Sequence, residues 1–217
     1  MYRCEAVSIP GFIQQVAVAY IANGYRFYVT GCIPPVKDLK AIDEKLIQRY
    51  EIDCSKWVRW RRKNRGLANV QYLRYRRFFI LLASQGPHEF FRRETQVQDI
   101  RRKPIQCFGY SVGCYQGRRG SWHPSVRIER ALFQALKKEF LECATSESFE
   151  SLYWRFAHLP FEPYSPVRRQ LLMLLASVNR ARAQAAVEVL PFEALRLRRR
   201  PQAPFGDVKE QADSTLS

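Results

Sequence analysis

The sequence lacks the local motifs of several enzyme classes. It contains no G-x-x-x-x-G-K-[ST] phosphate-binding loop and no G-x-S-x-G turn, so neither an ATPase nor a serine hydrolase is supported. Acidic residues are also scarce, 20 against 36 lysines and arginines. The carboxylates Asp38, Asp43, Glu44 and Asp53 fall on expected helix caps and helix faces. The cluster of carboxylates that a two-metal nuclease needs is therefore missing.

The six cysteines do not form a metal-binding pattern. They stand at positions 4, 32, 54, 107, 114 and 143, and no pair has C-x-x-C spacing. The closest pair, Cys107 and Cys114, has six intervening residues and no histidine nearby, so a zinc knuckle or ribbon is not expected. Because most of these cysteines have apolar, strand-like neighbours, we expect buried free thiols in a reducing compartment.

Long apolar runs and a secretion signal are missing as well. No stretch approaches the roughly 18 apolar residues of a membrane-spanning helix. The segment Met1 to Pro10 is too short and too polar for a signal peptide. We therefore expect a cytoplasmic or nucleoid-associated protein that has no membrane partner.

What the chain has in excess is positive charge. Its 217 residues carry a net charge of +16, and the isoelectric point is near 9.9. Such an excess causes self-repulsion in the compact state and raises the affinity for polyanions. An apolar share of 47% is enough to build a core, so the charge does not indicate a disordered chain. The charge predicts a nucleic-acid partner. The alternatives are an acidic protein partner, or a solvated basic surface that binds nothing specific.

Hydrophobic periodicity and capping residues predict a mixture of helices and strands. Helices are expected from Ser8 to Gly24 and over 39–50, 55–65, 129–144, 148–159 and 165–187. Strands are expected over 25–33, 68–75, 77–83 and 104–115. Residues 126–128 form either a short strand or the entry to a helix, and 192–198 is a possible edge strand.

The order of these elements predicts the fold class. Strand–helix–strand–strand–helix–strand is the plan of ferredoxin-like folds, and the sequence fits it if 104–115 or 192–198 closes the sheet. We therefore predict an α+β protein with an antiparallel ferredoxin-like sheet and additional C-terminal helices. Residues 1–145 would form a nucleic-acid-binding core, and 146–200 a helical extension packed on it. Residues 201–217, with nothing apolar to bury, would form a disordered tail.

The stretch 57–83 holds the strongest candidate for a binding site. It begins inside a basic helix, KWVRWRRKNR at 56–65, that combines cations for phosphate with two aromatic faces for an unstacked base. We expect Val58 and one tryptophan to face the sheet and the other tryptophan to lie on the surface. The alternative is a basic helix whose two tryptophans are both core. The predicted nucleic-acid-binding residues of this helix are Lys56, Trp57, Arg59, Trp60, Arg61, Arg62, Lys63 and Arg65.

Basic residues recur in the turns and loops that follow this helix, and we expect these loops to cluster at one end of the sheet. A glycine-flanked arginine pair would also allow close approach to phosphate. The predicted binding residues of the loops are Arg74, Arg76, Arg77, Arg92, Arg93, Arg101, Arg102, Lys103, Arg118 and Arg119. The arginines of the last helix, Arg168, Arg169, Arg180 and Arg182, are expected to be solvated only. The run LRLRRR at 195–200 either binds nucleic acid or blocks strand pairing.

Histidines supply the candidates for catalysis. His88 and Glu89 follow the apolar run FFILLA, and His123 lies in the segment SWHPS. If their loops meet, these three side chains would hold one Mg²⁺ or Mn²⁺ beside a phosphate. The alternative is a set of ordinary surface histidines.

Residues 25–145 resemble the single-strand DNA nucleases of the HUH class, which include rolling-circle replication initiators and small tyrosine transposases. The likeness rests on an early strand ending in Val-Thr-Gly at 29–31, a hairpin, a histidine after an apolar strand, and a later helix. In that family a histidine–hydrophobe–histidine strand holds the metal and a helical tyrosine attacks the DNA. Here Pro-His-Glu at 87–89 supplies a single histidine, and the helix at 129–144 has no tyrosine. The resemblance therefore implies DNA binding in plasmid or mobile-element biology, and it does not carry the activity over.

These observations together predict a nucleic-acid-binding protein with some single-stranded character, for DNA more than for RNA. One alternative is a metal-dependent nuclease or transposase of the HUH type. Another is a protein-binding subunit of a nucleoprotein complex. No cofactor is expected, apart from Mg²⁺ or Mn²⁺ in the nuclease alternative.

Overall fold

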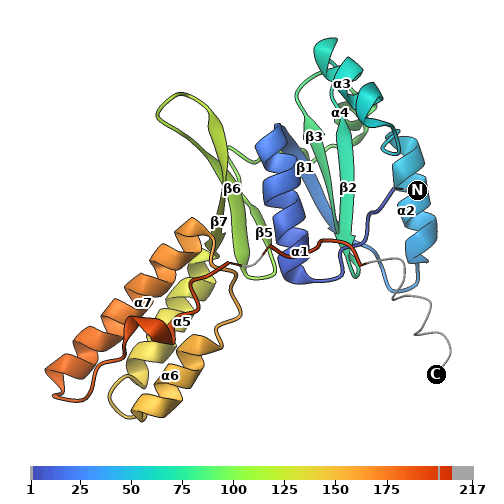
Figure 1. The fold of residues 1–217 in the computed structure, drawn as a ribbon. Helices are drawn as coiled ribbons and strands as arrows, with labels where there is room; N and C mark the ends of the chain where they lie inside the picture. Colours follow the sequence, from blue (N-terminus) through green and yellow to red (C-terminus); the bar gives the residue numbers. More distant parts are fainter. Residues whose placement is uncertain (1, 200, 207–217) are drawn as a thin grey trace. The chain divides into compact units, whose positions relative to one another are not determined.

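The computed structural model describes residues 2–199 and 201–206 (Figure 1). The chain is a mixed α+β protein with antiparallel sheets and several helices, as the sequence predicted. Its described residues divide into two compact units. The first, which we call the sheet unit, comprises residues up to 104 together with 113–124 and 201–206. The second, the helical unit, comprises 105–112 and 125–199.

The sheet unit is built on four strands in the order β2-β3-β1-β4, with antiparallel neighbours. The strands are β1 (Tyr25–Cys32), β2 (Val70–Tyr75), β3 (Phe78–Ser84) and β4 (Gln98–Asp99). The strand that closes the sheet was therefore predicted wrongly, because the two-residue β4 pairs with Phe27 and Tyr28. Residues 104–115 turn back on themselves at Phe108 and Gly109, whose φ angles are 51° and 78°. Within the segment 192–198, the residues Phe192–Ala194 form a short 3₁₀ turn, and the segment contains no strand.

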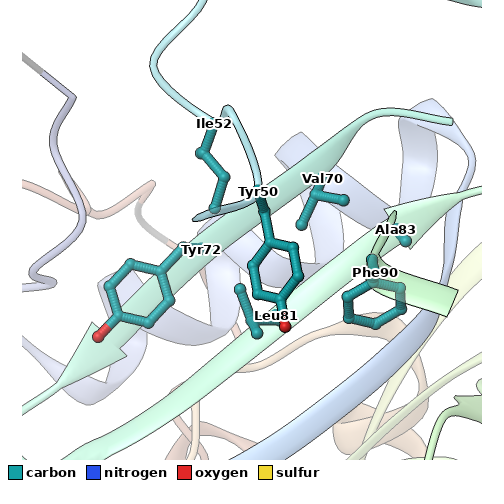
Figure 2. Packing of buried hydrophobic residues seen from close by; sticks show 7 residues of the cluster. All are labelled: Tyr50, Ile52, Val70, Tyr72, Leu81, Ala83 and Phe90. Atoms are coloured by element: carbon teal, nitrogen blue, oxygen red, sulfur yellow. The ribbon is translucent and has the colours of Figure 1, made fainter. Parts of the chain in front are cut away.

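The sheet has helices on both faces because β3, with the sequence FFILLAS, has no polar side to turn toward water. On one face, Tyr50 and Ile52 at the end of α2 (Leu39–Arg49) pack on strand residues such as Tyr72 and Leu81 (Figure 2). On the other face lies α1 (Ile9–Gln14), where Phe12 meets Phe78 edge to face at 5.8 Å. Figure 1 shows α1 and α2 on opposite sides of the strands.

Local sequence signals set the ends of these helices, and the predicted caps are confirmed. The side chains of Ser8, Asp38 and Ser55 accept backbone N–H groups at the starts of α1, α2 and α3 (Lys56–Asn64). Beyond α1 the chain continues as a π-helical segment, Gln15–Tyr20, and a 3₁₀ turn, Ile21–Asn23. It ends at Gly24, whose φ of 93° suits a residue without a Cβ.

The helical unit contains α5 (Arg130–Glu142), α6 (Phe149–Ala157) and α7 (Ser165–Gln184). The contact pattern groups α5 with α6 and α7 and not with the sheet of residues 25–99. Arg182 on α7 was predicted to be solvated, and this is wrong because the side chain is buried. Its guanidinium donates to the carbonyl oxygens of Ala144 at 2.7 Å and Glu147 at 3.2 Å. Arg182 therefore binds the backbone between α5 and α6.

A second sheet has three strands in the order β5-β6-β7. They are β5 (Ile105–Cys107), β6 (Tyr110–Gln116) and β7 (Trp122–Ile128). The ambiguity at residues 126–128 is thus resolved in favour of a strand, and the helix α5 begins after it.

Residues 201–206 lie against the N-terminal part of the sheet unit. The amide of Gln14 exchanges two hydrogen bonds with the backbone of Gln202, at 2.8 and 3.0 Å, and Val7 N–H donates to Pro204 at 3.0 Å. The predicted disordered tail therefore begins with a segment that forms backbone hydrogen bonds, and its remainder, 207–217, falls outside the described residues.

All six cysteines are free thiols, but none is fully buried and Cys32 is exposed. The expectation of buried thiols is therefore wrong, although that of free thiols is confirmed. Among the helices that the structure describes, none is both long and apolar enough to cross a membrane.

Candidate nucleic-acid interface

The helix α3 presents its aromatic and cationic side chains to solvent. Only Val58, Arg59 and Arg62 are half-buried, and at about 100° per residue these three share one face. Trp57 and Trp60 lie on the opposite side and are 59% and 52% exposed. The expectation that one tryptophan faces the sheet is wrong, and so is the alternative that both are core. Two arginines occupy the inner face of α3 in their place.

Polar contacts hold α3 on the sheet unit. Arg62 forms an ion pair with Glu51, and its guanidinium also lies 3.5 Å from the Glu51 carbonyl oxygen. The Asn69 side chain donates to the carbonyl oxygen of Arg59 at 3.0 Å. The chain leaves the helix at Gly66, whose φ is 72°, and Leu67 N–H closes the last turn on Arg62. The helix is thus fixed from its inner face, and its outer face keeps its side chains for solvent or a partner.

The two exposed tryptophans stack on each other. Their ring centroids are 4.7 Å apart with an interplanar angle of 13°, and the Arg61 guanidinium lies 5.6 Å from the Trp57 ring centroid. Aromatic stacking contributes about 0.5–1.5 kcal/mol of stabilisation in addition to that of the buried area. Burial in the core would stabilise a large apolar side chain by roughly 1.5–3 kcal/mol. Both rings stay more than half exposed, so their stabilisation falls short of that of a core position, and the pair presents flat aromatic surface to solvent.

Cations surround this aromatic pair, and α3 itself has no acidic residue. Lys56, Arg61, Lys63 and Arg65 are exposed, and none of the four forms an ion pair with a described residue. We call this set the α3 surface, consisting of Lys56, Trp57, Trp60, Arg61, Lys63 and Arg65. It combines an aromatic platform with uncompensated positive charge.

Arg74 does not belong to a binding surface, although the sequence predicted that it would. It is 3% exposed, and its guanidinium donates to Asp43 at 2.7 Å and to both carboxylate oxygens of Glu5 at 2.7 Å. The Tyr72 hydroxyl donates to the same Asp43 at 2.6 Å. Arg74 is the cation of an internal network, so it is not available to a phosphate.

The predicted clustering of loops at one end of the sheet is also wrong for the hairpin turn. The turn at Arg76 and Arg77 follows β2, whereas α3 precedes it, and six strand residues span about 20 Å. Arg76 is exposed and lies 5.5 Å from the Tyr75 ring centroid. Arg77 donates to the carbonyl oxygens of Pro34 at 2.7 Å and Pro35 at 3.1 Å. The turn is therefore separate from the α3 surface, and Arg77 already has partners.

Some of the basic residues in the segment 85–103, which follows β3, form ion pairs. On α4 (Glu89–Arg93), Arg92 and Arg93 pair with Glu89 at 2.7 and 2.9 Å. Arg101 pairs with Asp99 at 2.6 Å. The neighbouring Arg102 and Lys103 are exposed. Because β4 runs antiparallel to β1, the chain after Asp99 heads toward the end of the sheet where β2 begins.

Arg118 and Arg119 are exposed in the loop between β6 and β7. The loop is closed by a hydrogen bond from Gly117 N–H to the Ser121 carbonyl oxygen at 2.7 Å. Gly120 has a φ of 78°, which permits the tight turn. These two arginines stand next to each other between Gly117 and Gly120, in a loop that follows β6.

The histidine candidates have separate structural roles. His88 Nδ1 accepts the Phe90 N–H at 3.0 Å and caps α4, while Glu89 forms the ion pairs on that helix. His123 Nε2 lies 2.9 Å from Ser121 Oγ. Over residues 2–199 and 201–206, no group of three histidine, cysteine or acidic side chains is placed to hold a metal ion. The structure therefore does not bring the three metal candidates together.

The environment of His88 predicts an acid-sensitive helix cap. Burial, and then the charge of Arg62, lowers the pKa of His88 against the opposing effects of Glu51 and Glu89. In the unfolded chain the histidine pKa is near 6.5. As the pH falls, the unfolded state therefore binds a proton at His88 before the folded state does. The contribution of neutral His88 to stability is present above about pH 6.5 and is lost as the pH falls toward its folded-state pKa.

Denaturant unfolding at pH 7, 6 and 5 checks this, with His88→Asn as the comparison. Asparagine keeps a capping oxygen, so the variant should match the wild-type free energy of unfolding to within about 1 kcal/mol at pH 7. It should lose less stability than the wild type between pH 7 and pH 5. Equal losses in the two proteins would show that His88 does not contribute.

Sequence reasoning missed a pocket beside α3. A cavity of about 670 Å³ is lined by residues from several elements of the sheet unit, among them Tyr2, Tyr20, Tyr25, Arg59 and Gln71. One local signal was present, since Gln71 is a polar residue inside a strand of buried residues. The tyrosines come from separate segments, and no spacing rule links them.

Comparisons with known proteins do not add a relative to this picture: no protein-family model matches the chain, and no curated protein or solved structure matches it.

Proposed function

We propose that the protein binds single-stranded nucleic acid through the α3 surface. One observation carries the proposal: Trp57 and Trp60 are both exposed and stacked on a helix that has three exposed cations, a fourth at its C-cap, and no acidic residue. Lysine and arginine neutralise phosphates, and an aromatic ring offers a face on which an unpaired base stacks. Bases in a duplex are already stacked, so the tryptophans favour a single strand over a duplex.

The nature of the strand and its setting belong to the same proposal. DNA is the stronger candidate because the chain resembles the HUH-class single-strand DNA nucleases, which also suggests a plasmid or mobile-element setting. A cytoplasmic location is supported by the six free cysteines, since a reducing compartment keeps such thiols free.

The ferredoxin-like plan is proposed for the sheet unit alone. Read from its short edge, the sheet has the order β4-β1-β3-β2 with antiparallel neighbours, which is the order that a β-α-β-β-α-β chain of this plan gives. Here α2 and α3 connect β1 to β2, and α4 connects β3 to β4. On this view α1 is an addition that covers the second face of the sheet.

A salt-titrated binding assay with labelled single-stranded DNA, RNA and duplex DNA tests the function. Single strands should bind more tightly than the duplex. With four phosphate contacts, log K should fall against log salt with a slope of about −3, since each contact contributes roughly 0.7. Strands should remain intact with Mg²⁺ or Mn²⁺, because His88, Glu89 and His123 are not brought together.

A matched pair of variants locates the contact. Lys63→Ala/Arg65→Ala should make the slope shallower by about 1.4, since two phosphate contacts are lost. Arg169→Ala/Arg180→Ala removes two exposed cations from α7 and should leave the slope unchanged. Binding that does not depend on salt, or equal effects of the two variants, would contradict the proposal.

A further inference from the structure

The pocket beside α3 is large enough for a small ligand. Its volume of about 670 Å³ lies within the range of roughly 300–1,000 Å³ that ligand sites occupy. Lys56 and Arg59 line it from α3, and they lie on the flank of the helix next to Trp57 and Trp60. A strand bound along the α3 surface would therefore pass the pocket entrance.

One wall of the pocket is a fixed set of hydrogen-bonding groups. The Tyr2 hydroxyl lies 2.9 Å from Gln71 Oε1, and Gln71 Nε2 donates to the Tyr25 hydroxyl at 3.1 Å. Gln71 is only 5% exposed, so its amide is held in one orientation. The Tyr25 hydroxyl accepts this bond and has its own hydrogen to donate. The wall thus offers a positioned donor at the edge of the cavity.

The charge of the pocket is positive. Arg3, Lys56 and Arg59 line it, against the single carboxylate of Asp53. Arg59 Nε is buried and has no hydrogen-bond partner in the described structure. That nitrogen has almost no accessible surface, so an anion in the pocket would meet the cationic side chains that line it, Arg3, Lys56 and Arg59. The flank of α3 therefore suits a phosphate.

We propose that this pocket holds one unpaired nucleotide of the strand that the α3 surface binds. Arg59 and Lys56 hold its phosphate, and the Tyr25 hydroxyl and Gln71 amide contact the edge of its base. The inference rests on the proposed function and adds to it that the protein distinguishes bases at one position. The α3 surface supplies affinity for any strand, because phosphate contacts and base stacking are indifferent to sequence.

Labelled homopolymers of adenine, cytosine and thymine, each of about 12 nucleotides, test the pocket. The wild type should prefer one base over the others by at least about fivefold, the effect of one good hydrogen bond. Ala19→Phe places a ring in the pocket lining. This variant should bind every homopolymer as weakly as the wild type binds its least preferred one. Val18→Phe alters the exposed neighbouring residue and should keep the preference.

Two smaller changes test the wall without filling the cavity. Tyr25→Phe keeps the ring that packs against Tyr20 at 5.9 Å, and it should reduce the base preference by about three- to tenfold. Arg59→Met should weaken all strands by about tenfold or more, because a charge-assisted contact is lost. Lys63→Met, on the outer side of α3, should weaken them less. Circular dichroism confirms that each variant is folded.

The outcomes separate this inference from the proposed function. Salt-dependent strand binding without any base preference, unaltered by Ala19→Phe, would overturn the pocket assignment and leave the proposed function standing. A wild-type chain that binds no strand would overturn both. The 5′-monophosphate of the preferred base should displace the strand only in large excess. Displacement at equal concentration would assign the pocket to a free nucleotide and overturn the strand assignment.

Discussion

Replacing Arg74 with methionine is expected to lower the free energy of unfolding by about 3–5 kcal/mol, because it removes the cation from a buried ion pair. Asp43 would keep its carboxylate at 6% exposure beside neutral donors, the hydroxyl of Tyr72 and the thiol of Cys4. Burial, and then the hydrogen bond to Asp43, raises the pKa of Tyr72, so that this hydroxyl stays a neutral donor and cannot replace the lost charge. Glu5 is more than half exposed, so water would accommodate it.

The matched control is Arg76→Met, two residues farther along the same strand and turn. Arg76 is exposed and its guanidinium lies over the Tyr75 ring, so its loss should change the free energy of unfolding by about 0.5 kcal/mol or less. Tyr72→Phe removes one hydrogen bond of the network and should cost about 1–3 kcal/mol. Denaturant unfolding of the three variants gives the order. Similar losses for Arg74→Met and Arg76→Met would show that the buried network does not stabilise the fold.

The same pair of residues shows what a sequence can and cannot predict here. Helix starts were predictable because Ser8, Asp38 and Ser55 act through hydrogen bonds to residues two or three positions away. Arg74 and Arg76 stand in one basic cluster, RYRR, and only one of them is buried. The difference depends on Asp43 and Glu5, which are 31 and 69 residues away in the chain. No local pattern contains that information.

Strand pairing was predictable only in part, for a related reason. The hairpin of β2 and β3 follows from two adjacent β-rich runs and a short turn. The closing strand β4 has two residues and no recognisable pattern, so sequence periodicity favours longer segments for this position in the sheet. The positive φ angles at Phe108 and Gly109 fold 104–115 into a hairpin, and a non-glycine residue such as Phe108 gives little sign of this in sequence.

The composition of α3 identifies it as the candidate site, but the predicted orientation of its tryptophans is wrong. Aromatic residues usually lie in the core, which is why one tryptophan was assigned to the sheet side of α3. The helix is instead positioned by the ion pair of Arg62 with Glu51 and by the bond from Asn69 to Arg59. These long-range polar contacts rotate α3 so that both tryptophans face solvent.

Removing both rings with Trp57→Ala/Trp60→Ala is expected to weaken single-strand binding by about 10- to 100-fold. A stacked base contributes about 1–3 kcal/mol, and 1.4 kcal/mol corresponds to tenfold. The salt slope should stay the same because no cation is removed. Trp154→Ala is the matched control, since Trp154 is 62% exposed on α6 and stacks on His158 at 4.2 Å. It should bind strands like the wild type.

The unchanged salt slope is the part of this prediction that separates base stacking from a structural role of the rings. Trp57 also lies under Arg61, so its loss would free that guanidinium to move. If the rings only position cations, the double alanine variant would lose phosphate contacts and its slope would become shallower. Trp57→Phe/Trp60→Phe sharpens the test, because two smaller flat rings should recover most of the affinity if stacking is the cause. A slope that changes together with affinity would contradict stacking and assign the rings to holding Arg61.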